Sequence, residues 1–123
     1  MNLWFSMAID NITRLHHMID AAKEAIAFAN GKCREDLESD RLLLLALVKD
    51  LEIIGEAASK LTPEIRACYP QLPWIDIITM RNRLVHEYFG IDESIVWDTV
   101  TKDLHPLIEE LEIILQHETV NAN

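Results

Sequence analysis

Residues 41–60, with the sequence RLLLLALVKDLEIIGEAASK, decide the fold class. Apolar residues recur there at three- and four-residue spacing and cover a broad face of a helix: Leu43, Leu44, Ala46, Leu47, Leu51, Ile53, Ile54, Ala57 and Ala58. A helix that is apolar over so much of its circumference lies in the middle of a bundle or against a second subunit. Ser39 or Asp40 can cap its start, and Gly55 in mid-helix indicates that another backbone comes close.

The same periodicity predicts helices on both sides of this stretch. A first helix covers about residues 7–29 and ends at Asn30-Gly31, because glycine tolerates the left-handed conformation that follows a helix. Thr62-Pro63-Glu64 provides the cap and first positions of a short helix. Pro70 ends that short helix.

Two further helices are predicted in the C-terminal half. Trp74 begins one of about fifteen residues that ends near Phe89-Gly90. Asp92 caps a last helix over about residues 93–116, and Pro106 should kink or split it. The predicted fold is all-α: an antiparallel bundle of four to five helices in one domain over residues 1–123.

Composition supports one globular domain. The chain has 123 residues, 50% of them hydrophobic, with only 3 Gly and 4 Pro, which excludes collagen-like and disordered classes. The apolar run 42–48 is far shorter than the roughly 20 residues that span a bilayer. The two cysteines lack ligand spacing, and no leader is recognisable, so a cytoplasmic protein without membrane association is expected.

Charge is distributed unevenly along the chain. The net charge is −10, which argues against a uniformly basic surface for nucleic acid. Residues 91–123 hold eight acidic residues and one basic residue, whereas residues 62–90 hold three of each. The neutral segment therefore stands out, and it is also where the candidate site residues lie.

The candidate site lies in residues 80–89, MRNRLVHEYF. On an ideal helix Arg81 and His86 lie roughly 140° apart, so a site assembled across two chains is easier to build than one within a chain. Asn82 and His86 would share a face, and Asn82 could orient the imidazole. No HExxH, P-loop or EF-hand pattern is present, and no metal or cofactor is expected.

Arginine and histidine together suit cleavage of RNA. Attack by the ribose 2′-OH needs a base, an acid for the leaving oxygen, and cations for the developing charge on phosphorus. Two chains meeting at this helix would supply two histidines and two arginines, and no metal would be required. The same residues also fit an ordinary amphipathic helix with an extended Arg and a core His, because an Arg and His at this spacing is a weak pattern.

Residues 81–88, RNRLVHEY, resemble the R-x4-H-x-Y motif of the HEPN superfamily, and specifically of the HepT toxin family. The similarity extends over essentially the whole chain and is most specific over residues 54–104. Its other segments, similar in order and spacing, are Ile54-Gly55-Glu56-Ala57-Ala58, Leu72-Pro73-Trp74, Val96-Trp97 and Asp103-Leu104.

The resemblance implies a homodimeric, metal-independent endoribonuclease toxin of a type VII toxin–antitoxin system, acting on an RNA such as a transfer RNA. It implies that Arg81 and His86 are catalytic and that Asn82 is the polar residue after the arginine. Arg83 is a candidate phosphate contact. It also implies that a minimal nucleotidyltransferase antitoxin attaches AMP to Tyr88. The added bulk and negative charge would then block a phosphate site.

Two alternatives remain open from the sequence. One is a catalytically idle subunit that binds substrate for, or scaffolds, the nucleotidyltransferase. The other is a structural helical module, in which Arg81→Ala and His86→Ala would alter only stability. An intact Arg81 and His86 pair favours the ribonuclease, because an idle scaffold does not need it. Because the net negative charge disfavours unspecific binding to RNA, the chain is expected to act on few RNAs.

Overall fold

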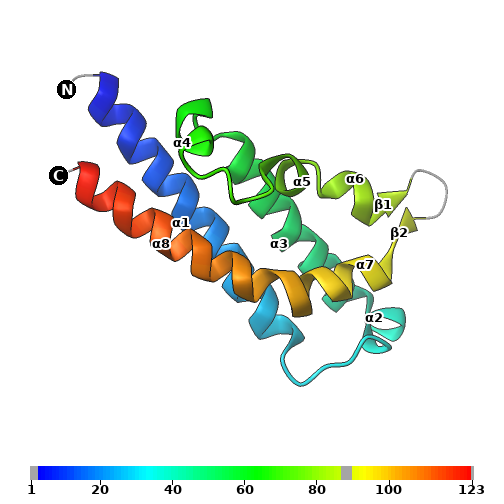
Figure 1. Ribbon diagram of the computed structural model, residues 1–123. Coiled ribbons are helices and arrows are strands. Elements are labelled where there is room, and N and C mark those ends of the chain that lie inside the picture. The colour runs from blue at the N-terminus through cyan, green and yellow to red at the C-terminus, as the bar shows by residue number, and fades with distance from the viewer. Residues whose placement is uncertain (1–2, 87–89, 123) are drawn as a thin grey trace.

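Three long helices form the framework of the computed structural model, which describes residues 3–86 and 90–122 (Figure 1). They are α1 (Leu3–Ala29), α3 (Arg41–Ser59) and α8 (Leu104–Ala122). Helix α1 packs against both α3 and α8 and runs antiparallel to each, so that both chain ends lie at one end of the bundle. The predicted all-α fold is confirmed, with shorter helices between the long ones.

The core is built by the apolar faces of these three helices. Fully buried side chains come from all of them: Leu15 and Met18 of α1, Leu47, Leu51 and Ile54 of α3, and Leu111 and Ile114 of α8. The broad apolar face predicted for residues 41–60 is therefore the inner face of α3. Its outer side still carries two exposed leucines, Leu42 and Leu45.

The helix ends follow the predicted capping residues. Gly31, two residues after the end of α1, has a φ of 77°. The Asp40 carboxylate accepts from the Leu43 N–H at 3.0 Å, and the Thr62 hydroxyl accepts from the Ile65 N–H at 3.3 Å to begin α4 (Pro63–Cys68). A short helix that was not predicted, α2 (Asp36–Ser39), lies in the connection before α3.

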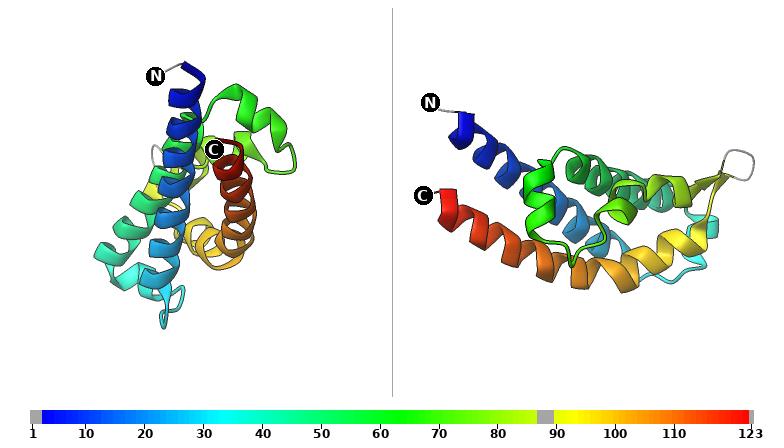
Figure 2. Two further views of the ribbon diagram at one scale, coloured as in Figure 1. Left: turned by 90° about the vertical axis from the view of Figure 1, so that its left-hand side faces the viewer. Right: turned by 45° about the horizontal axis from the view of Figure 1, so that its top comes forward.

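The C-terminal helix is interrupted where Pro106 predicted a kink or split. Helix α7 (Glu93–Asp98) passes into a π-helical turn, η1 (Thr99–Asp103), before α8 begins, and Figure 2 shows the three as one curved course. Because Pro106 has no N–H, it leaves a carbonyl of the preceding turn without its helical partner. The wider turn accommodates this, and the Leu104 N–H donates to the Thr99 carbonyl.

Residues 74–91 differ most from their prediction. The expected fifteen-residue helix is wrong: the segment forms α5 (Trp74–Ile78), α6 (Arg81–Leu84), β1 (Val85–His86) and β2 (Gly90–Ile91). β1 and β2 pair antiparallel, with His86 opposite Gly90, at the end of the bundle away from the chain termini (Figure 1). The helical ladder already fails after α5, because the Asn82 N–H donates to Thr79 three residues back rather than four.

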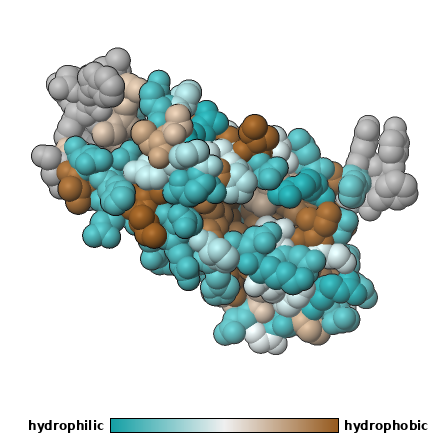
Figure 3. Space-filling model, viewed as in Figure 1, coloured by the Kyte–Doolittle hydropathy of each residue, from teal (hydrophilic) through white to brown (hydrophobic). Residues whose placement is uncertain are grey.

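Hydrophilic residues cover most of the face seen in Figure 3, and hydrophobic residues reach it in small separate patches. Within the part of the chain that the structure describes, no helix is both long and apolar enough to cross a membrane.

Candidate functional site

The segment 74–91 carries the candidate site residues, and it packs against the framework at Gly55. A Cβ placed on this glycine would lie 3.0 Å from the Ile77 carbonyl oxygen, so the backbone at the end of α5 sits directly on α3. This is the close approach that a glycine in mid-helix predicted. The Trp74 indole, largely buried, donates to the Tyr69 carbonyl at 2.9 Å and fixes the start of α5. Arg81 therefore begins α6 at a defined place beside α3.

Arg81 points to the framework side of this segment. Its Nε donates to Glu52 Oε1 at 3.2 Å, which makes both a hydrogen bond and an ion pair with α3. The Arg81 side chain is 66% exposed and the Glu52 side chain 31% exposed. The guanidinium is thus held at one nitrogen while most of its surface stays accessible.

Arg81 also lines a groove with a volume of about 610 Å³, between α1, α3 and the end of α5. Its wall carries four cations, Arg14, Lys49, Lys60 and Arg81, against two carboxylates, Glu52 and Glu56, although the whole chain has a net charge of −10. A groove of this character on an acidic protein concentrates anionic ligands at one place.

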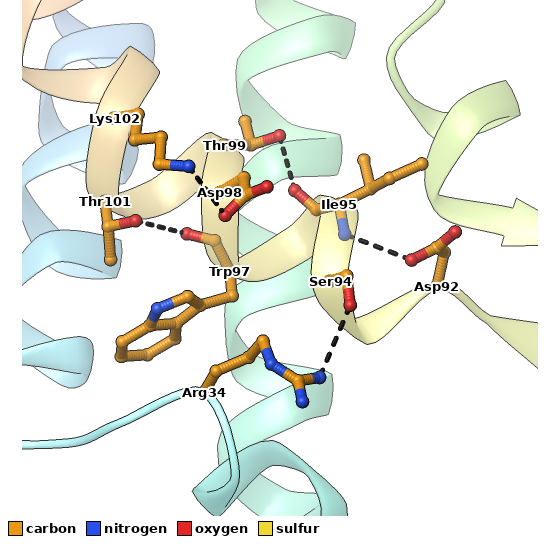
Figure 4. A network of polar contacts seen from close by, with 9 residues as sticks. All are labelled: Arg34, Asp92, Ser94, Ile95, Trp97, Asp98, Thr99, Thr101 and Lys102. Atoms are coloured by element: carbon orange, nitrogen blue, oxygen red, sulfur yellow. Dashed lines mark hydrogen bonds and ion pairs between the residues drawn. The ribbon is translucent and has the colours of Figure 1, made fainter.

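His86 lies on β1 and does not line this groove. Its side chain is 48% exposed, and its Nε2 is 3.8 Å from Asp92 Oδ2. The other oxygen of Asp92, Oδ1, accepts from the Ile95 N–H at 3.1 Å and caps α7, as Figure 4 shows. The carboxylate beside the imidazole is therefore held by a helix terminus.

The surroundings of Asp92 reinforce this arrangement. The Thr99 hydroxyl donates to the Ile95 carbonyl at 2.7 Å, and Arg34 donates to Ser94 at 3.3 Å from the connection before α2 (Figure 4). The sequence identified Asp92 as a helix cap. It could not show that the second oxygen faces His86, because that depends on the chain reversing between β1 and β2.

The structure does not bring all of the predicted site residues together. The groove that Arg81 lines does not include His86. The argument that Asn82 and His86 share a helical face is wrong, because the helix ends at Leu84 and His86 lies on a strand. Among the described residues no hydrogen bond joins these two side chains, and Asn82 is exposed. Tyr88, the predicted AMPylation site, lies outside the described residues.

Arg83 faces a different hollow from Arg81. Its Nη2 donates to the Asp76 carbonyl oxygen at 3.4 Å. It lines a cavity of about 370 Å³ between α5 and the start of α8, whose wall also carries Asp76, Asp103 and Glu110. With three carboxylates and Arg83 as its single cation, the wall of this cavity is less suited to a phosphate than the groove that Arg81 lines.

One buried carboxyl group lies near the groove and was not predicted. Asp50 on α3 is 2% exposed, and its Oδ2 has no hydrogen-bond partner within the described residues. Burial, followed by the neighbouring Glu24 carboxylate, raises the pKa of Asp50 to about 7. Asp50, Glu24 and His17 line a hollow of about 240 Å³. The sequence gave no sign of this carboxyl pair, because Glu24 and Asp50 lie on different helices, α1 and α3.

For metal ions, residues 3–86 and 90–122 contain no cluster of three or more His, Cys, Asp or Glu side chains arranged to bind one. The arrangement instead offers a cationic groove, a fixed guanidinium and an exposed imidazole beside a carboxylate. These groups can bind phosphate oxygens and transfer protons near neutral pH.

Known proteins resemble the chain over most of its length. Residues 18–114 match the family described as Ribonuclease HepT-like. A protein of Caldanaerobacter subterraneus subsp. tengcongensis, provisionally named an RNase, is 38% identical over 104 residues, covering 85% of this chain and 93% of that protein. A Thermococcus cleftensis protein, provisionally named ribonuclease HepT, is 33% identical over 93 residues, covering 76% of this chain and 84% of that protein. No solved structure matches the chain. The chain therefore belongs to the HepT-like ribonuclease family.

Proposed function

We propose that this protein is the toxin of a type VII toxin–antitoxin system, a cytoplasmic, metal-independent endoribonuclease with Arg81 and His86 as its catalytic residues. The observation that carries the proposal is the exposed Arg81 in a cationic groove of an otherwise acidic, HepT-like chain. A groove of this kind suits the phosphate backbone of RNA. The match of residues 81–88 to the R-x4-H-x-Y pattern supports the same residues.

The chemistry proceeds without a covalent enzyme intermediate. A neutral histidine takes the proton of the ribose 2′-OH, and the 2′-oxygen forms a bond to phosphorus. Arg81 stabilises the charge on the phosphorane oxygens, and a protonated histidine gives a proton to the leaving 5′-oxygen as the P–O5′ bond breaks. The products are a 2′,3′-cyclic phosphate and a 5′-hydroxyl.

A homodimer would supply the two histidines. Within one chain Arg81 lines the groove and His86 does not, so a second chain is a natural source of the missing partner. The outer stripe of α3, formed by Leu42 and Leu45, supports self-association, because Leu42 is 80% exposed and Leu45 44% exposed. We propose that the active dimer buries this stripe.

Inhibition would act through Tyr88, two positions from His86. We propose that a minimal nucleotidyltransferase antitoxin transfers AMP to this hydroxyl. The attached phosphates repel an RNA backbone, and the nucleosides obstruct it. Coexpression with the antitoxin should raise the intact mass by whole AMP units, and Tyr88→Phe should prevent the increase.

The test is cleavage of total cellular RNA in EDTA by protein expressed without its antitoxin, with the intact mass recorded to detect earlier AMPylation. Wild type and Tyr88→Phe should give discrete products, and His86→Ala should give none. His105→Ala removes another exposed histidine, on α8, and should cleave as wild type does. If unmodified, folded wild-type dimer cleaves no RNA, the ribonuclease proposal fails in favour of the idle binding subunit.

A further inference from the structure

We propose that Glu52 is the positioning residue of the site: it fixes the orientation of the Arg81 guanidinium toward the groove. This inference rests on the proposed function, because it assigns a role relative to the catalytic arginine. It starts from the contact between Arg81 Nε and Glu52 Oε1, at 3.2 Å, which joins α6 to α3.

The atom that Glu52 engages determines what remains for substrate. A guanidinium has five N–H donors in a rigid planar fork, and one of them is on Nε. Because Nε is taken by Glu52, the end of the fork with Nη1 and Nη2 is left to bind a phosphate. Among the described residues, neither terminal amino group of Arg81 has a hydrogen-bond partner. The contact therefore presents the bidentate edge that matches two phosphate oxygens.

The location of Glu52 suits a positioning residue. It lies in the middle of α3, next to the fully buried Leu51, whereas Arg81 begins a helix of only four residues. The Glu52 side chain is only 31% exposed, against 66% for Arg81. A flexible arginine on a short element is thus tied to a rigid one, which preserves the geometry that phosphate binding needs.

Glu56, one turn further along α3, provides the contrast. It lines the same groove and carries the same charge, but its carboxylate pairs with Lys60 at 3.3 Å and not with Arg81. Removing either carboxylate makes the groove more positive and should strengthen RNA binding. Only removal of Glu52 should also release the Arg81 fork.

The test is single-turnover cleavage of a defined RNA by Glu52→Ala, Glu52→Gln and the matched control Glu56→Ala. Glu52→Ala should lower the cleavage rate constant at least tenfold without weakening RNA binding. Glu52→Gln keeps an oxygen acceptor for Nε and should stay within about threefold of wild type. Glu56→Ala changes the charge of the groove by the same amount but keeps the Arg81 contact, so it should lower the rate constant far less than Glu52→Ala does. Equal rate constants for Glu52→Ala and Glu56→Ala, or faster cleavage by Glu52→Ala, would overturn the proposal.

A second measurement monitors the hydrogen bond between Arg81 and Glu52 directly. In ¹H–¹⁵N spectra, the Arg81 Nε–H resonance, assigned by its loss in Arg81→Lys, should exchange slowly with water in wild type and Glu56→Ala, and rapidly in Glu52→Ala. The same exchange rate in all three proteins would refute the positioning role. Slow exchange in a wild type that cleaves no RNA would refute the proposed ribonuclease while leaving the Glu52 contact established, so the two failures are distinguishable.

Discussion

Two regions of the molecule differ in how they are stabilised: the framework of α1, α3 and α8, and the segment 74–91. The framework buries continuous apolar faces along helices of 19 to 27 residues. The segment is broken into pieces of two to five residues, and the polar side chains that the structure describes in it remain exposed. Long helices obtain their stability from packing, whereas the short pieces are held by their contacts with the framework.

The difference shows how exposed reactive groups can be held in place. Arg81 is tied to α3 through Glu52, and His86 lies beside the cap of α7 through Asp92. Each of these two side chains thus lies against a carboxylate on a neighbouring helix or at its cap. Changes in the framework should therefore act on stability, and changes in the segment on activity.

The largest effect on stability is expected for Leu47→Ala in α3. Leu47 is fully buried, and its truncation should lower the free energy of unfolding by about 2–5 kcal/mol through lost transfer energy and the cavity left behind. Urea unfolding measures this change. Ile113→Ala, at an exposed position on α8, is the control and should cost less than about 1 kcal/mol. Equal losses would mean that α3 does not bury the face described.

Gly55→Ala tests the joint between the two regions. The new Cβ would lie 3.0 Å from the Ile77 carbonyl, and the backbone must shift to admit it. We expect a loss of about 1–3 kcal/mol, because this overpacking outweighs the roughly 1 kcal/mol that Ala gains over Gly in a helix. Cleavage should fall as well, since α5 leads to Arg81. Arg41→Ala, exposed at the other end of the same helix, should leave both unchanged, and a stabilised Gly55→Ala would contradict the close approach.

Asp50→Asn should change how stability depends on pH. The native state raises the pKa of Asp50 to about 7 from an ordinary value near 3.8, so it binds this proton more tightly than the unfolded chain does. Wild type should therefore lose stability as pH rises from about 4 through about 7, and Asp50→Asn should lack this loss. At pH 8 the variant should be more stable by about 1 kcal/mol or more, or roughly 3–6 °C in Tm.

Thermal unfolding at pH 4 and pH 8 measures this difference. Glu24→Gln should give a smaller gain at pH 8, because the carboxylate of Glu24 is a lesser cause of the raised pKa than burial. A stability difference between wild type and Asp50→Asn that stays constant over this range would show that Asp50 titrates normally.

Arg83→Ala should have the smallest effect on cleavage, and it tests the difference between Arg81 and Arg83 within the segment. Arg83 faces Asp76, Asp103 and Glu110 rather than the cationic groove. We expect cleavage within about threefold of wild type, which corresponds to less than about 1 kcal/mol. Arg81→Ala should reduce cleavage at least a hundredfold in the same assay. Similar losses for the two arginines would contradict the assignment of the groove to the site.

The framework could be predicted from the sequence because its signals are local. Apolar periodicity, the cap at Asp40, the stop at Gly31 and the interruption caused by Pro106 each depend on a few neighbouring residues. Even the approach at Gly55 followed from the cost of glycine in mid-helix.

The site geometry could not be predicted in the same way. The motif placed Arg81 and His86 close together in the sequence, but a helical interpretation wrongly put Asn82 and His86 on one face, because the helix ends at Leu84. The β-branched residues Ile75, Ile77, Ile78 and Thr79 favour a break that the apolar pattern hid. The partners Glu52 and Asp92 are set by tertiary packing, and linear spacing carries no signal for such pairs.

The most direct test of the account is the chemistry of the RNA ends that the protein produces in EDTA. Cleavage by the 2′-OH with Arg81 and His86 predicts 2′,3′-cyclic phosphate and 5′-hydroxyl ends, formed by wild type and His105→Ala and not by Arg81→Ala or His86→Ala. Products with a 5′-phosphate, or cleavage that EDTA abolishes, would contradict the account.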